Sequence, residues 1–242
     1  MKIVAIGGGE NGRPGYPYET KEIDEEIVKF SGRKNSNFLF IGFASKKAAD
    51  SYFSVMAKIF SNLGCNCIHL KERELTDKEI TKQKIQTADI IYVGGGNTLY
   101  LMNLLRKFGL DKLLKFAGER GAVLCGISAG GICWFAYGNS DSRTNGANNI
   151  RVTGLGFIDA LFCPHLIREP QRHEDLKRMM KTTHKMVALG LEDCTALKTD
   201  GGNYEILKSK PNRKAYKCYY KNGQYIKKEI AEIGKLTELL AE

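Results

Sequence analysis

Up to about residue 191, the chain alternates short, almost wholly apolar runs with longer amphipathic stretches. The apolar runs predict strands at 2–6, 37–43, 66–70, 89–93, 121–125, 160–164 and 187–191. The amphipathic stretches predict helices near 20–31, 50–63, 76–86, 97–117, 129–137 and 171–184. Strands that are apolar along their whole length are typical of parallel sheets whose two faces are both covered by helices. The alternation therefore predicts an α/β fold with a doubly wound, mostly parallel sheet.

The pattern changes after Leu191 to short strands separated by turns, followed by a terminal helix near 229–241. The expected strands lie at 195–199, 204–208, 214–220 and 224–228. Asn222-Gly223 is a strong signal for a two-residue hairpin turn between the last two strands. We expect these strands to extend the same sheet in antiparallel fashion. The chain shows no linker or internal repeat, so we expect residues 1–242 to form a single domain with a sizeable core.

The cysteines and the apolar segments bear on the cellular compartment. The seven cysteines are scattered without a disulfide framework, which is typical of reduced thiols. No apolar run reaches the roughly 18 residues of a membrane span, and the N-terminus lacks the long apolar region of a signal peptide. We therefore expect a cytoplasmic protein that has no membrane partner.

The net charge of +10 is concentrated in residues 208–228, which hold eight basic residues and no acidic ones. Tyrosines interleave with these charges, and this combination can form a nucleic-acid surface. The alternative is a solvated hairpin at a sheet edge, where lysines discourage pairing with other strands. We favour the hairpin, so nucleic acid is not an expected partner.

Ser128 lies within the sequence GISAGG (126–131), directly after the apolar run AVLC (122–125). A strand that turns tightly on small residues and leads straight into a helix is the context of a nucleophile elbow. Such an elbow exposes a serine hydroxyl above the sheet, and the N–H of Ala129 at the helix start would bind an oxyanion. The alternative is that Ser128 merely caps the helix.

Two glycine-rich loops also follow predicted strands. GGGENG (7–12) matches a dinucleotide-binding loop, but RPGYP (13–17) cannot continue into the helix that such a site needs, so no nucleotide cofactor is expected. In the loop GGGN (94–97), backbone N–H groups of Gly95 and Gly96 are free to face a ligand. Gly96 would supply the second oxyanion donor. Asn97 is expected to help bind the substrate or, alternatively, to cap the following helix.

A serine nucleophile needs a base. Of the four histidines, His69 lies in a predicted strand, while His173 and His184 fall in or beside a predicted helix. Only His165 directly follows the end of a predicted strand. Because active sites of such sheets lie beyond the carboxyl ends of the strands, His165 is the candidate base for Ser128.

The base in turn needs an acidic group that orients its imidazole. Asp141 is the leading candidate, and Glu169, Glu192 and Asp193 are the alternatives. Asp141 lies in a polar segment, where it could also be an ordinary turn residue.

Three of these motifs occur in a recognisable order: GGGNT (94–98), GISAGG (126–131) and Pro164-His165. Together they resemble the peptidase E (aspartyl dipeptidase) and cyanophycinase family of serine peptidases, over residues 1 to about 197. The resemblance implies a flavodoxin-like fold related to class I glutamine amidotransferases, with serine replacing their cysteine. It also implies Ser128 as the nucleophile, His165 as the base and Asp141 as the orienting acid.

We therefore expect a serine peptidase that hydrolyses short peptides, with dipeptides carrying an acidic N-terminal residue as the leading candidates. The resemblance carries the acidic preference, and Arg143, Arg151 and Arg168 fit it because a guanidinium binds a carboxylate through two hydrogen bonds. Such chemistry requires no metal or organic cofactor, and the sequence leaves a homodimer open. The alternative function is a catalytically silent protein that binds a small ligand in the same cleft.

Overall fold

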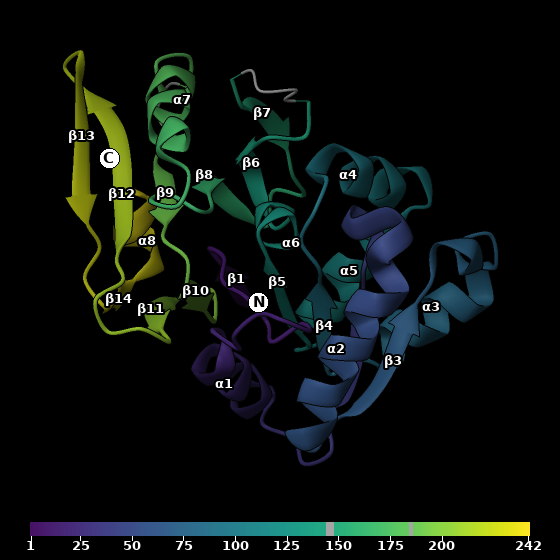
Figure 1. The fold of residues 1–242 in the computed structure, drawn as a ribbon. Coiled ribbons are helices and arrows are strands. Elements are labelled where there is room, and N and C mark those ends of the chain that lie inside the picture. Colours follow the sequence, from purple (N-terminus) through teal and green to yellow (C-terminus); the bar gives the residue numbers. More distant parts are fainter. Residues whose placement is uncertain (144–147, 184–185) are drawn as a thin grey trace.

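The computed structural model describes residues 1–143, 148–183 and 186–242. In this part of the chain the strands form two sheets with helices packed around them (Figure 1). The protein is therefore a mixed α/β fold, as the sequence predicts. None of the helices in these ranges is long and apolar enough to cross a membrane.

The first sheet contains eight strands in the order β14-β11-β10-β1-β5-β4-β2-β3. Its parallel strands are β1 (Lys2–Ile6), β5 (Val123–Ile127), β4 (Ile90–Val93), β2 (Asn37–Ile41) and β3 (Asn66–Leu70). Beyond β1, the sheet continues through antiparallel pairings with β10 (Thr195–Thr199), β11 (Asn203–Lys208) and β14 (Ile233–Lys235). The predicted antiparallel extension by 195–199 and 204–208 is thus confirmed.

Alternate residues of the parallel strands pack on opposite faces of this sheet, as the pleat of a strand requires. On one face, Val4 and Phe40 share a core with α1 (Lys21–Ser31) and α2 (Ala49–Asn62). On the other face, Ile3 and Ile41 share a core with the remaining helices of this layer. Those helices are α3 (Lys78–Thr87), α4 (Thr98–Lys107) and α5 (Leu110–Glu119).

The second sheet contains six strands in the order β13-β12-β9-β8-β6-β7. Its strands are β6 (Phe135–Ser140), β7 (Ile150–Thr153), β8 (Ile158–Cys163), β9 (Ala188–Leu191), β12 (Ala215–Lys221) and β13 (Gln224–Glu229). The prediction of one continuous sheet is therefore wrong. The strands predicted at 160–164 and 187–191 are parallel to each other, as β8 and β9, but they belong to the second sheet.

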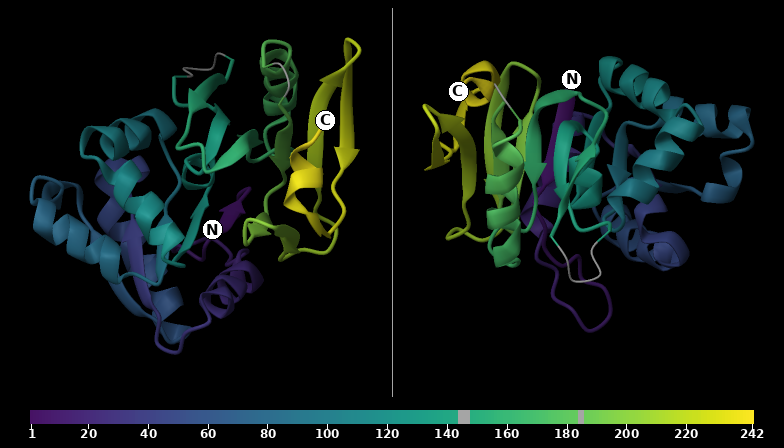
Figure 2. Two further views of the ribbon diagram at one scale, coloured as in Figure 1. Left: turned by 180° about the vertical axis from the view of Figure 1, so that it is seen from behind. Right: turned by 90° about the horizontal axis from the view of Figure 1, so that it is seen from above.

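The lysine-rich segment forms the predicted hairpin, because β12 and β13 pair around Asn222 and Gly223, both of which have positive φ. The hairpin is part of the second sheet and does not extend the first. Both views of Figure 2 show it at one edge of the molecule, on the side opposite α3. Ion pairs join Lys208 to Glu232 and Lys214 to Glu229, which reduces the free positive charge of this surface.

Three predicted helices differ from the observed ones. Gly109, at φ 68°, separates α4 from α5 where a single helix over 97–117 was expected. The helix expected over 129–137 ends as α6 (Ala129–Ile132), because Phe135 enters β6 and stacks on Phe162 of β8. The terminal helix is only α8 (Leu236–Leu240), since residues 233–235 pair with β11 as β14. The remaining helical segments are η1 (Phe43–Ala48), η2 (Glu72–Glu74) and α7 (Pro170–Met180).

The junction of β5 and α6 packs so closely, on itself and on β4, that one position in each of the two elements must be glycine. A Cβ atom on Gly126 would lie 2.5 Å from the carbonyl oxygen of Gly130. A Cβ atom on Gly130 would lie 1.9 Å from the carbonyl oxygen of Val93 at the end of β4. Backbone on both sides leaves no room to adjust, so these glycines fix the position of Ser128 between them.

This packing predicts that Gly130→Ala destabilises the protein by at least about 3 kcal/mol, because overpacking against backbone cannot be relieved by moving a side chain. The free energy of unfolding, measured by chemical denaturation, is the test.

Gly202→Ala is the matched control. A Cβ atom there would meet only Asp200 Oδ1 at 3.5 Å, an ordinary contact, so we expect a change within about 1 kcal/mol. Similar unfolding free energies for the two variants would contradict the close packing of the elbow.

Candidate active site

Three polar side chains from different strand ends meet where the two sheets adjoin. Ser128 follows β5 of the first sheet, His165 follows β8 of the second, and Asp193 lies between β9 and β10. The Ser128 Oγ atom is 3.0 Å from His165 Nε2, and His165 Nδ1 is 2.6 Å from Asp193 Oδ1. The side chains of His165 and Asp193 are only 15% and 11% exposed. The structure therefore holds a continuous hydroxyl–imidazole–carboxylate chain of hydrogen bonds.

The backbone that carries these hydrogen-bonded side chains is strained at three positions. Ser128, His165 and Cys194, which follows Asp193, have φ angles of 54°, 56° and 68°. Positive φ in a residue other than glycine costs about 1–3 kcal/mol and is concentrated at functional sites. The N–H groups of the three strained residues donate in turn to the carbonyl oxygens of residues 6, 7 and 8, at 3.1, 3.0 and 2.9 Å. The end of β1 thus holds all three in place.

The glycine loop after β1 makes room for the histidine–carboxylate pair. A Cβ atom on Gly8 would lie 2.0 Å from Asp193 Oδ1 and 2.4 Å from His165 Nδ1. Gly8 is therefore part of the wall of the site. Because its loop follows a predicted strand, the sequence places it at the same edge of the sheet as the elbow, but it does not indicate the contact with the histidine–carboxylate pair.

The electrostatics of the pair keep Asp193 ionised. Burial by itself would raise the pKa of Asp193, but the hydrogen bond from His165 and the positive charges of His165 and Arg168 outweigh burial and lower it. Arg168 Nη1 lies 3.5 Å from the second carboxylate oxygen, Oδ2. With Nδ1–H of a neutral imidazole donating to Asp193, Nε2 is free to accept the proton of Ser128. This arrangement activates a serine hydroxyl as a nucleophile.

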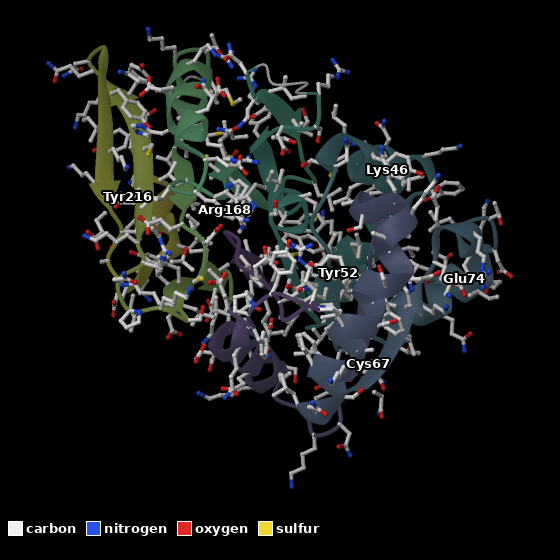
Figure 3. The ribbon with its side chains drawn as sticks, in the orientation of Figure 1. Lys46, Tyr52, Cys67, Glu74, Arg168 and Tyr216 are labelled. Carbon is white, nitrogen blue, oxygen red and sulfur yellow. The ribbon has the colours of Figure 1, made fainter. Side chains whose placement is uncertain are left out.

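Ser128 and His165 open onto a cavity of about 640 Å³, called here the catalytic cavity. The loop after β1 and the first turns of α2 form its walls, including Tyr52, which lies opposite Arg168 (Figure 3). Its charged groups are Glu10, Arg13 and Arg168. Glu10 pairs with Arg13 at 2.9 Å and lies 3.7 Å from Arg168, so the cavity offers groups of both charges to a ligand.

The predicted oxyanion loop lies beside the nucleophile. Gly95 and Gly96 line the catalytic cavity, and a Cβ atom on Gly95 would lie 3.4 Å from the Cβ atom of Ser128. The N–H groups of Gly96 and Ala129 make no hydrogen bond to any residue in the described ranges. Neither group is therefore occupied by a protein acceptor in these ranges, and their role as oxyanion donors stays a prediction.

Asn97 has a different role from the predicted contact with substrate. Its Oδ1 accepts the N–H of Tyr100 at 2.9 Å and so caps α4. Its Nδ2 donates to the carbonyl oxygen of Ser142 at 3.1 Å. Both ends of the amide are engaged, and Asn97 does not line the catalytic cavity. Asn97 is therefore a helix cap, which was the alternative considered from the sequence.

The structure does not bring Asp141 to the histidine, and this corrects the leading candidate for the orienting acid. Asp141 comes at the end of β6, a strand that the sequence analysis missed, and its carboxylate lies 3.6 Å from Arg172 Nη2. Asp193 binds His165 Nδ1 instead. The contact with Arg172 places the Asp141 carboxylate beside α7.

The other two alternatives also have different partners. Glu169 binds the same Arg172 guanidinium, and the buried Glu192 accepts the N–H of Lys214 at 3.2 Å. One sequence signal did point to Asp193: it follows a predicted strand, as Ser128 and His165 do.

The remaining histidines lie outside the catalytic cavity where the structure describes them. His69 stacks on Phe53 at 4.8 Å, and His173 packs edge-on against Tyr225 at 5.8 Å. His184 lies outside the described residues.

The chain is similar to several known proteins. The model of a family described as peptidase family S51 matches residues 3–207. An uncharacterized peptidase of Bacillus subtilis, YgaJ, is 30% identical over 235 residues, which is 96% of each chain. Peptidase E of Shewanella amazonensis is 27% identical over 84% of this chain and 86% of its own. The crystal structure of a peptidase from an acI-B1 Actinobacterium has the same fold, with a TM-score of 0.73 at 17% identity, over 97% of this chain and 96% of that one.

The hydrogen-bond chain predicts that Asp193→Asn slows the covalent labelling of Ser128 by an organophosphonate probe by roughly 10²-fold or more. The amide cannot stabilise the imidazolium that forms when Ser128 is deprotonated. Mass spectrometry of the labelled peptide gives the rate and the site.

Asp141→Asn is the control, since Asp141 pairs with Arg172 and not with the imidazole. Its labelling rate should stay within a few-fold of the wild-type rate. Equal slowing in the two variants, or slowing in Asp141→Asn alone, would contradict the assignment of Asp193.

Proposed function

The chain belongs to peptidase family S51, and we propose that it is a serine peptidase that hydrolyses short peptides with Ser128, His165 and Asp193 as its catalytic triad. The observation that carries the proposal is the hydrogen-bonded chain of these three residues at the catalytic cavity. The strained φ of Ser128 supports it, because an elbow of this kind presents the hydroxyl to a substrate.

The first half of the reaction transfers the acyl group to the enzyme. Ser128 Oγ attacks the carbonyl carbon of the scissile peptide bond while His165 Nε2 takes the hydroxyl proton. The N–H groups of Gly96 and Ala129 stabilise the negative oxygen of the tetrahedral intermediate. His165 then gives its proton to the leaving nitrogen, and the C–N bond breaks.

The second half releases the acyl group. A water molecule attacks the ester carbon while His165 accepts its proton, and the bond to Ser128 Oγ breaks as the proton returns to that oxygen. Asp193 stays ionised throughout because its pKa is lowered, and its charge stabilises the imidazolium that forms twice in the cycle.

In this proposal, one arginine carries the acidic preference for the substrate. Of the three arginines considered from the sequence, Arg168 lines the catalytic cavity, whereas Arg151 donates to Thr183 Oγ1 and Arg143 does not line it. We propose that Arg168 binds the side-chain carboxylate of an acidic residue on the acyl side of the cleaved bond. Its side chain is 56% exposed and shared with Glu10 and Asp193, which reduces the strength of that contact.

The mechanism predicts that Ser128→Ala and His165→Ala each abolish hydrolysis, because members of a triad act as a unit. In the wild type, kcat/KM should fall once the medium is acidic enough to protonate the imidazole, since an imidazolium cannot accept the serine proton. The Asp193 carboxylate stays ionised near neutral pH because its pKa is lowered, so its titration does not affect kcat/KM there.

Steady-state rates on a panel of dipeptides at several pH values provide the measurement. A pH-independent rate, or an active Ser128→Ala protein, would contradict the mechanism. A protein whose Ser128 reacts with no phosphonate probe would instead fit the catalytically silent binding protein.

The role of Arg168 predicts a preference for Asp-Leu over Asn-Leu and Leu-Leu of about two- to fivefold in kcat/KM, the size expected for a half-exposed ionic contact. Arg168→Gln should remove the preference, because the amide carries no charge.

Arg151→Gln is the matched control, since Arg151 lies outside the catalytic cavity. If all three dipeptides are hydrolysed equally by the wild type, or if the preference survives in Arg168→Gln, then acidic selectivity through Arg168 is wrong.

A further inference from the structure

A second cavity of about 660 Å³ adjoins the catalytic cavity. We propose that it binds the leaving-group side of a substrate longer than a dipeptide, with the substrate's C-terminal carboxylate at Lys58. This inference rests on the proposed peptidase function and specifies the length of the substrate and the direction in which it binds. It treats the two cavities as one continuous binding site.

The continuity of the two cavities comes from shared walls. Asn11, Pro14 and Val55 line both of them. Along α2, the lining side chains follow one helical face, with Ser51 and Val55 beside the nucleophile and Lys58 and Asn62 beyond it. A ligand that leaves Ser128 along this face passes Val55 and enters the second cavity.

The opposite wall is held in place by hydrogen bonds within the protein. Residues 11–18 form a narrow hairpin, with Asn11 bridged to Tyr18 and the N–H of Gly12 donating to the carbonyl oxygen of Pro17 at 2.9 Å. The hydroxyl of Tyr18 donates to the buried carboxylate of Asp24 in α1 at 3.0 Å, which fixes the hairpin to that helix. The second cavity is thus a preformed passage between α1, α2 and the hairpin.

The lining of the second cavity fits a peptide with apolar side chains and a negative end. Val55, Ile59 and Leu63 provide apolar surface. The charged lining residues are Lys21, Glu25 and Lys58, and Glu25 lies 3.9 Å from Lys21, which offsets its charge. Within the described part of the chain, Lys58 has no ion-pair partner.

The charge decides the direction of the bound peptide. An N-terminal extension would place an ammonium group beside the lysines, whereas a C-terminal extension places a carboxylate there. The leaving group of the reaction therefore occupies the second cavity.

The helix also sets the length of the leaving group. Ser51 and Lys58 are seven residues apart, or roughly 10 Å along α2 at 1.5 Å per residue. An extended peptide covers that distance with about three residues at roughly 3.3 Å each. A tetrapeptide cleaved after its first residue would therefore bring its carboxylate to Lys58.

The test compares kcat/KM for Asp-Leu, Asp-Leu-Leu and Asp-Leu-Leu-Leu, each with a free carboxylate. We expect a rise of roughly tenfold or more from the dipeptide to the tetrapeptide, because leucine side chains are buried in the second cavity. Amidation of the tetrapeptide, or Lys58→Gln, should lower the ratio of tetrapeptide to dipeptide several-fold. Val55→Trp, which obstructs the passage, should abolish the length dependence.

Lys115→Gln is the matched control, because Lys115 is an exposed lysine on α5 that lines neither cavity. A tetrapeptide-to-dipeptide ratio near one, an equal rate for the amidated peptide, or a preference for the N-terminally extended Leu-Leu-Asp-Leu would each overturn the inference.

Binding of the same peptides to Ser128→Ala, measured by calorimetry, separates this inference from the proposed function. If the wild type hydrolyses none of the peptides, the peptidase proposal fails, but a Kd that tightens with length and weakens on amidation still supports the second cavity as a peptide site. A Kd that is independent of length, or the absence of binding, overturns it.

Discussion

The site depends on the close approach of three chain segments to the carboxyl end of β1. The carbonyl oxygens of residues 6–8 accept the N–H groups of Ser128, His165 and Cys194 in turn. This approach is open only to a residue without a side chain, because a Cβ atom on Gly8 would overlap the His165–Asp193 pair. A few backbone hydrogen bonds therefore join the two sheets and align the nucleophile, the base and the acid at the same time.

The positive φ angles at Ser128, His165 and Cys194 mark the positions of the site where the backbone is strained. Each of these residues comes shortly after a buried strand, so the strands fix the chain on one side of the strained residue. At Ser128, Gly126 and Gly130 allow direct packing on β4. The result is a preorganised hydroxyl, which needs no rearrangement before it meets a substrate carbonyl.

Much of the site could be predicted from local sequence. Ser128 and His165 each follow an apolar run, and the rule that sites lie beyond the carboxyl ends of strands placed them together. For the orienting acid, the same rule favours Glu192 and Asp193, which follow the predicted strand at 187–191, but it does not choose between them. Choosing among Asp141, Glu169, Glu192 and Asp193 requires knowing that β9, which precedes Asp193, pairs with β8, which precedes His165. No local pattern specifies that pairing.

The sequence by itself determined the α/β class, most of the strands, the Asn222-Gly223 hairpin and the elbow at Ser128, because each depends on residues close together in the chain. Only the tertiary structure decided that the strands divide into two sheets, that Asp193 binds His165, and that Gly8 borders the pair. These features depend on contacts between segments far apart in sequence. Apolar strands look alike whichever sheet they join, so hydrophobic pattern alone does not specify the partner.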